Sequence, residues 1–177
     1  MRRGSTAAVV LLWALLLTGC QPRQETPLTE QRDEATGFAV RTPPEWTRSD
    51  GGGGRIRFVP PGTPVPDASS EFIAVFVTDV SGPLDESGVR RLVFSELTIH
   101  GVSGFQQDPR SSPDARWDKF EVTGSSGGVE WASVGVAVSG AAKTYVLVCA
   151  KPFDKWRDGQ KQCDEVVRTF RPGTLRD

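Results

Sequence analysis

The segment from Tyr145 to Cys149 has five consecutive uncharged side chains, most of which are apolar. Successive side chains of a β-strand point to opposite faces of its sheet. A strand with this sequence would therefore present apolar groups on both faces, and each face needs a covering layer. The segment thus predicts a central strand in a sheet that is packed from both sides.

The rest of the sequence predicts a mainly antiparallel sheet with helices packed on its faces, which is an α+β fold. The connections at 124–128 and 140–142 are short enough for an antiparallel meander. Glycines at 51–54 and four prolines within 60–70 predict surface loops. The expected strands are 37–42, 55–59, 71–80, 102–108, 115–123, 129–139 and 143–151.

Two segments have the apolar period of an amphipathic helix. In 84–100 the periodic positions end at His100, and Gly101 would act as the C-terminal cap. Asp85 and Glu86 would then lie in the first turn, where the helix dipole favours acidic groups. In 155–170 the stripe consists of Trp156, Cys163, Val166, Val167 and Phe170.

The first nineteen residues are typical of a bacterial export signal. Arg2 and Arg3 precede an apolar run of 11 residues at 7–17, whereas a membrane span needs about 20. The run ends in Leu17, Thr18, Gly19 and Cys20, which resemble a lipobox. In that motif, cleavage before the cysteine leaves a lipid-bearing residue, so we expect acylation, palmitate included, at Cys20. An ordinary secreted protein with an incidental cysteine is the alternative.

The expected mature chain starts at Cys20 and is close to neutral. It keeps 19 basic and 22 acidic residues, a net charge of −3, so anchoring to a membrane would depend on the acyl chains. The balance also argues against nucleic acid as a partner. Gln21 stands where enteric lipoproteins retained in the inner membrane carry Asp, which favours the outer membrane, facing the periplasm. We expect a flexible tether at 20–36, one domain at 37–172 and a tail at 173–177.

Both ends of the expected domain resemble a known family. Residues 37–40 followed by 43–46 are similar to the opening of the PsbP/Mog-like superfamily, and the strand 143–149 with the helix end at 166–170 is similar to its close. The resemblance, including to DcrB/LpqN-type bacterial lipoproteins, implies an α/β/α sandwich that binds other proteins and has no catalytic motif, cofactor or metal. The loops at 51–54 and 60–70 depart from leaner members.

The remaining cysteines, Cys149 and Cys163, are expected to pair. Export places them in an oxidising compartment, and Cys20 is used for lipid. One ends a strand and the other lies on the inward stripe of the following helix, so contact is plausible in the expected fold. Two buried free thiols are the alternative.

Other candidate sites have ordinary structural explanations. Residues 124–128 match Gly-x-Ser-x-Gly, but no helix follows and His100, the one histidine, comes earlier in the chain, so a hairpin turn is favoured. His100 also has no second histidine with which to bind a metal. The carboxylates suggest acid–base chemistry, but a solvated face is favoured for Asp114, Asp118, Glu121, Asp154, Asp158 and Asp164. The glycine run 51–54 suggests phosphate binding, but a loop is favoured. A pocket for an apolar ligand is one role for Trp46, Trp117 and Trp131, but core packing is the more common one.

Two functions follow from these observations, and a third is nearly excluded. The first is a non-catalytic envelope lipoprotein whose domain docks on a partner protein. The second is a carrier or sensor that binds a small apolar ligand between sheet and helix, and an apolar cavity of several hundred Å³ would favour it. A solid core with an exposed apolar patch would favour docking. Hydrolysis fails on the motif context.

Overall fold

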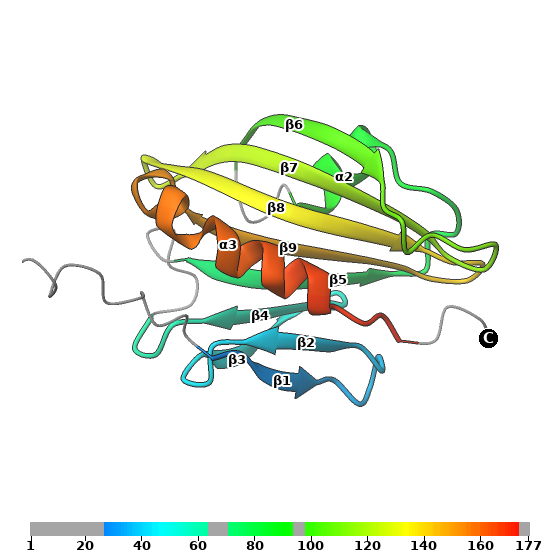
Figure 1. Cartoon of the computed structure of the whole chain (residues 1–177), viewed down its shortest axis with the longest axis horizontal. Coiled ribbons are helices and arrows are strands. Elements are labelled where there is room, and N and C mark those ends of the chain that lie inside the picture. Colours follow the sequence, from blue (N-terminus) through cyan, green and yellow to red (C-terminus); the bar gives the residue numbers. More distant parts are fainter. Residues whose placement is uncertain (1–26, 64–70, 94–97, 174–177) are drawn as a thin grey trace, which may run out of the picture.

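The computed structural model describes residues 27–63, 71–93 and 98–173. Figure 1 shows a long, twisted sheet with one helix across its front and a shorter one behind it. The strands are β1 (Thr29–Arg32), β2 (Ala39–Thr42), β3 (Thr47–Gly52), β4 (Arg55–Val59), β5 (Phe72–Thr78), β6 (Thr98–Gln107), β7 (Arg116–Ser126), β8 (Val129–Ser139) and β9 (Thr144–Pro152), and the helices are α2 (Glu86–Val93) and α3 (Phe153–Thr169).

The described strands form two antiparallel sheets. The large sheet has seven strands in the order β3-β4-β5-β9-β8-β7-β6, and β1 pairs with β2 in a small second sheet. The predicted meander is present, because β7, β8 and β9 are consecutive neighbours. The predicted α+β class and the antiparallel sheet are confirmed.

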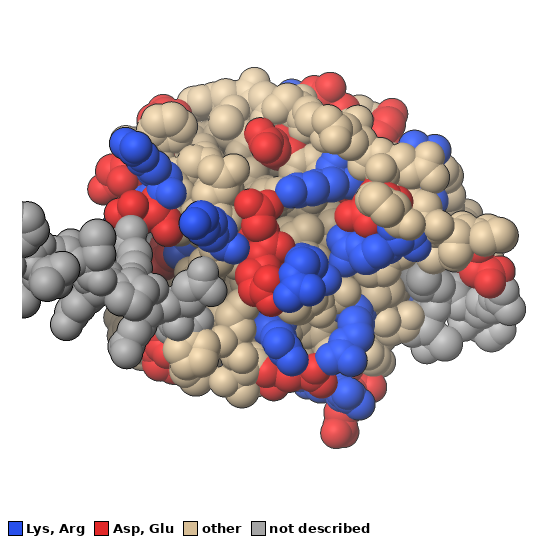
Figure 2. Space-filling model, viewed as in Figure 1, with Lys and Arg blue, Asp and Glu red and all other residues tan. Residues whose placement is uncertain are grey.

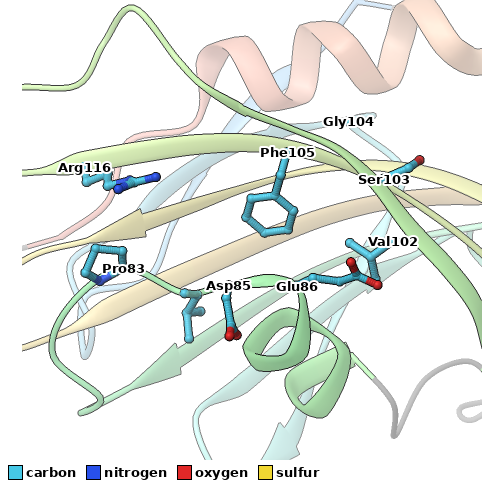
Figure 3. Close-up of a pocket in the computed structure, with 9 residues that line it drawn as sticks. Pro83, Asp85, Glu86, Val102, Ser103, Gly104, Phe105 and Arg116 are labelled. Atoms are coloured by element: carbon cyan, nitrogen blue, oxygen red, sulfur yellow. The ribbon is translucent and has the colours of Figure 1, made fainter.

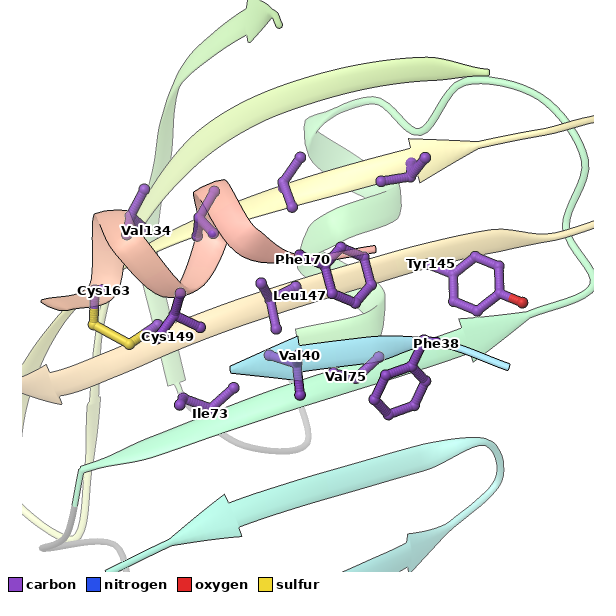
Figure 4. Close-up of a cluster of buried hydrophobic side chains, with 14 of the residues drawn as sticks. Phe38, Val40, Ile73, Val75, Val134, Tyr145, Leu147, Cys149, Cys163 and Phe170 are labelled. Atoms are coloured by element: carbon purple, nitrogen blue, oxygen red, sulfur yellow. A yellow bond between two sulfur atoms is a disulfide. The ribbon is translucent and has the colours of Figure 1, made fainter. Parts of the chain in front are cut away.

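β9 lies in the middle of the large sheet, and all nine of its residues are buried. Tyr145, Leu147 and Cys149 belong to the core beneath α3, which also receives Phe38 and Val40 (Figure 4). The alternate residues of β9 belong to a second core on the opposite face, together with side chains of α2. The prediction of a strand covered from both sides is therefore confirmed.

The predicted tether is wrong for residues 29–36, which are folded against β2. Asp33 explains this, because its buried carboxylate accepts hydrogen bonds from the amide and hydroxyl of Thr36, at 2.7 and 2.6 Å, and pairs with Arg48 at 2.6 Å. These bonds turn the chain so that β1 runs back along β2. Composition alone hid this, since the residues of β1 are polar. Residues 20–26 lie outside the described part of the chain.

The single helix predicted at 84–100 is also wrong. α2 ends at Val93, and β6 has already begun at Thr98. His100 is therefore a strand residue and does not lie at a helix C-terminus. Pairing of β6 with β7 outweighs the helical period, since Thr98 and Ile99 are β-branched residues that suit a strand.

The glycine run is a turn, as predicted, but part of it belongs to a strand that the sequence did not indicate. β3 extends to Gly52 and pairs with β4. Gly52, Gly53 and Gly54 have positive φ angles of 73°, 59° and 77°, a region that side chains other than glycine rarely adopt. The run therefore closes the β3–β4 hairpin.

The predicted pairing of Cys149 with Cys163 is present as a disulfide from β9 to α3 (Figure 4). The two Cα atoms are 5.3 Å apart, and both side chains are buried, at 1% and 0% exposure. The bond ties the last helix to the central strand.

We expect removal of the disulfide to destabilise the fold. Replacing both Cys149 and Cys163 by Ala should lower the free energy of unfolding by about 3 kcal/mol, because a loop of about 15 residues is no longer closed in the unfolded chain. Urea denaturation with and without reductant measures this. Reductant should lower the urea midpoint of the wild type and leave that of the double variant unchanged. Equal midpoints for the two proteins without reductant would contradict the prediction.

Asp33 should make stability depend on pH. Burial alone raises the pKa of its carboxyl group, but the hydrogen bonds from Thr36 and the charge of Arg48 outweigh burial and hold the pKa below 3.8. A lowered pKa in the folded state means stability that is present above pH 3.8 and is lost as the pH falls through the folded pKa.

We therefore expect Asp33→Asn to unfold at lower urea than the wild type at neutral pH, and the gap to narrow below pH 3.8. The matched control is Asp79→Asn, an exposed carboxylate whose replacement should leave the midpoint unchanged. A gap that stays constant across the pH range would show that Asp33 does not act through its charge.

Candidate binding pocket beside the edge strand

A pocket of about 530 Å³ opens between the start of α2 and the edge strand β6. Residues 83–86 line it from the helix side, residues 102–105 line it from β6, and Arg116 reaches it from β7 (Figure 3). It lies on the face of the sheet that α2 covers.

The floor of the pocket is apolar and largely buried. Leu84 and Val102 are each 8% exposed and belong to the core beneath α2. Phe105 is half-buried and stacks on Phe120, with the ring centroids 5.4 Å apart and the planes at 17°. The exposed part of Phe105 therefore supplies most of the apolar contact area that the floor offers.

The helix side of the pocket is acidic. The Asp85 carboxylate accepts a hydrogen bond from the Gly88 amide at 2.7 Å, so that Asp85 caps α2. This bond, with a second from the Ser87 hydroxyl, lowers the pKa of Asp85. Glu86 pairs with Arg90 one turn later, at 3.1 Å. The expectation that acidic side chains stand at the helix start is confirmed for these two residues.

Arg116 brings a positive charge to the same pocket. Its Nε and Nη2 atoms donate to the two carboxylate oxygens of Asp118, at 2.8 and 3.1 Å. Asp118 is 2% exposed, so Arg116 compensates a buried carboxylate while about half of its own side chain stays exposed. Figure 3 shows Arg116 beside Pro83 on one side of the pocket and Glu86 near Val102 on the other.

The strand that borders the pocket is irregular. The β6–β7 register shifts between Ile99 and Gly101 and again between Ser103 and Gln106. In the second shift, Gly104 and Phe105 lie opposite the single residue Phe120, and Gly104 has φ +65°. This β-bulge turns Phe105 toward α2, as Figure 3 shows.

The structure brings His100 together with Ser125, but not with the serine of the Gly-x-Ser-x-Gly match, Ser126. His100 Nε2 lies 3.0 Å from Ser125 Oγ, and its Nδ1 lies 3.4 Å from a carboxylate oxygen of Glu130. The order of groups resembles that of a serine hydrolase. However, the side chains of His100 and Glu130 are 47% and 63% exposed, so water screens both groups.

The three tryptophans do not share a pocket. Trp46 and Trp117 are buried in the core beneath α3, whereas Trp131 is buried on the opposite face, where it contacts Phe72 at 5.6 Å between ring centroids. The three side chains therefore pack the two cores and do not line a common ligand site.

The candidate carboxylates are dispersed over the surface or used in ion pairs. Asp118 pairs with Arg116, and Asp164 on α3 pairs with Lys119 at 2.9 Å. Figure 2 shows charges of both signs interspersed over the α3 face. Within residues 27–63, 71–93 and 98–173, no three His, Cys, Asp or Glu side chains gather in a way that could hold a metal ion.

Some predictions lie outside the described residues or need a separate observation. The lipobox residues Leu17, Thr18, Gly19 and Cys20 are in the part of the chain that is not described, so acylation stays a prediction. Neither α2 nor α3 has the length and apolar composition needed to cross a bilayer.

Comparison with solved structures identifies the fold. The solution structure of cyanobacterial PsbP (CyanoP) from Synechocystis sp. PCC 6803 matches with a TM-score of 0.55 and 12% identity, over 89% of this chain and 99% of that one. This chain has the PsbP-like fold. The resemblance noted at its two ends is therefore confirmed at the level of architecture.

The crystal structure of LpqN, a protein involved in cell envelope biogenesis of Mycobacterium tuberculosis, matches this chain with a lower score. It has a TM-score of 0.48 and 13% identity, over 84% of this chain and 91% of that one. No family model matches the sequence. A comparison with curated proteins gave no match either.

Sequence reasoning missed most of the pocket. In the sequence, Arg116 and Phe105 are ordinary strand residues, and only the bulge and the neighbouring helix bring them to one pocket. The acidic residues after Pro83 were recognised in the sequence, but they indicated only the start of a helix.

Proposed function

We propose that this protein is a lipid-anchored cell-envelope protein whose PsbP-like domain is a non-catalytic docking module for a partner protein. The pocket between α2 and β6 is the observation that carries the docking role. It is open, has an apolar floor and charged margins, and borders an edge strand, a combination that suits recognition of another chain.

The anchor is supported by the sequence. Arg2, Arg3 and the apolar run precede the lipobox, and Cys20 would carry the acyl chains. The Cys149–Cys163 disulfide suits an exported protein, because disulfides persist in oxidising compartments. Gln21 favours the outer membrane, with the domain facing the periplasm.

A non-catalytic role is supported by the exposure of the one group that resembles catalytic machinery. Ser125, His100 and Glu130 stand on an open surface, and the pocket described above is lined by other residues. A hydrolase needs a substrate site and preorganised oxyanion donors at its nucleophile. The Ser125 cluster instead serves as polar cross-strand contacts among β6, β7 and β8.

The second candidate function is a carrier or sensor for a small apolar ligand, and the pocket volume of about 530 Å³ favours it. Docking is preferred because the pocket is open at the β6 side, where Ser103 and Gly104 are exposed, and is bordered by charges. The exposed apolar patch that would favour docking is not found in the described residues, since Val80 and Phe153, the large apolar side chains that are more than half exposed, lie near opposite ends of β9. The preference therefore depends on the margins of the pocket.

Acylation can be tested directly. Cells that express the wild type and are fed radiolabelled palmitate should yield a labelled protein in the membrane fraction, whereas Cys20→Ser should be unlabelled and released from it. Cys149→Ala with Cys163→Ala is the matched control, since it removes two cysteines and should keep the label. A labelled Cys20→Ser protein would contradict the anchor.

Docking can be tested in intact cells with a photo-crosslinking amino acid in place of Pro83, an exposed residue at the pocket margin. We expect one exported protein to be crosslinked, and the adduct to disappear when Glu86→Lys alters the pocket. The same amino acid in place of Gln160, exposed on α3, is the control and should give no such adduct. Mass spectrometry identifies the product, and recovery of lipid or another small molecule alone would favour the carrier.

A further inference from the structure

The edge of β6 is covered along one half and open along the other. Near its start, Arg90 of α2 donates a hydrogen bond to the Ile99 carbonyl oxygen at 3.1 Å. From Val102 onward the strand borders the pocket. β7 is the one described strand with which β6 pairs, so its other edge faces outward here.

An outward edge with a pocket beside it matches one mode of peptide recognition. An extended chain can add to a sheet edge through backbone hydrogen bonds, while alternate side chains enter neighbouring pockets. A small molecule would use the pocket and leave the strand edge without a role. The juxtaposition of the two therefore favours an extended segment over a compact ligand.

One of the two charges at the pocket is held in place before anything binds. Asp118 fixes Arg116 through Nε and Nη2, so the Nη1 atom is not used in this ion pair. Arg90 contacts one carboxylate oxygen of Glu86, and the other oxygen is not used in that pair. Arg116 therefore loses little conformational entropy when it binds a ligand. Glu86 is 56% exposed, and its pair with Arg90 leaves it accessible to a basic group of a ligand.

We propose that the pocket binds an extended peptide segment of a partner protein that runs along β6 at residues 102–107. An apolar side chain of the segment lies on Leu84 and Phe105. An acidic side chain to one side of it contacts Arg116, and a basic side chain to the other side contacts Glu86. This inference rests on the proposed docking function and names its partner's chemistry.

The test is selection from a displayed library of random twelve-residue peptides on the full acylated protein in detergent micelles. We expect the selected peptides to share an apolar residue with an acidic residue on one side and a basic residue on the other. Pro83→Trp, which narrows the pocket mouth at an exposed position, should bind them at least about tenfold more weakly. Gln160→Trp on α3 is the matched control and should bind them like the wild type.

Charge reversal tests the assignment of each side. Glu86→Lys changes an exposed residue, and selection on this variant should replace the basic residue by an acidic one. Arg116→Gln should lose the preference for the acidic residue, and its unfolding midpoint should be measured as well because Asp118 is buried. If that variant does not fold, Glu86→Lys still decides the assignment.

Four results would overturn the proposal. The first three are an absence of selected peptides, selected peptides without the charge pattern, and undiminished binding to Pro83→Trp. The fourth is full displacement of a selected peptide by free leucine, a compact zwitterion, which would favour a small-molecule site. A cellular protein crosslinked at position 83 together with a failed peptide selection would retain the docking function and reject the extended segment.

Discussion

Burial of β9 on both faces is the constraint on which the rest of the structure depends. Its nine residues are all buried between β5 and β8, and side chains on its two faces belong to two separate cores. Each core needs its own cover, which α3 and the β1–β2 sheet supply on one face and α2 on the other. The short α2 leaves the margin of its face open, and the pocket is at that margin.

Sequence reasoning worked best where one period extends over a whole element. The strands β4, β8 and β9 and the helix α3 were predicted within about two residues, because turn residues bound them and their apolar residues show a clear pattern. It failed where contacts distant in sequence decide. The helical period through Leu97 and His100 is real, yet β6 gains more by pairing with β7, and β1 is ordered by Asp33, Thr36 and Arg48, which no composition measure registers.

The pocket was beyond sequence reasoning for a related physical reason. A β-bulge changes the direction of one side chain without a strong signature, so the position of Phe105 could not be predicted. Arg116 and Asp118 look like alternating charges on a strand, and only the burial of Asp118 shows that they form a pair. By contrast, Cys149 and Cys163 could be matched, since one follows from the strand period and the other from the helix period.

The pairing of β1 with β2 keeps residues 29–36 against the domain. β1 and its turn bind through the Asp33–Arg48 pair and a four-residue ladder with β2, and they take no part in the seven-stranded sheet. If this small unit peels away under tension, residues 29–38 become free chain and add up to about 33–36 Å of reach. The core beneath α3 would lose Phe38, which is fully buried and packs on Phe170. The contacts of β1 and its turn, including the pair of Arg171 with Glu30, therefore act together to set how much chain is free in front of the domain.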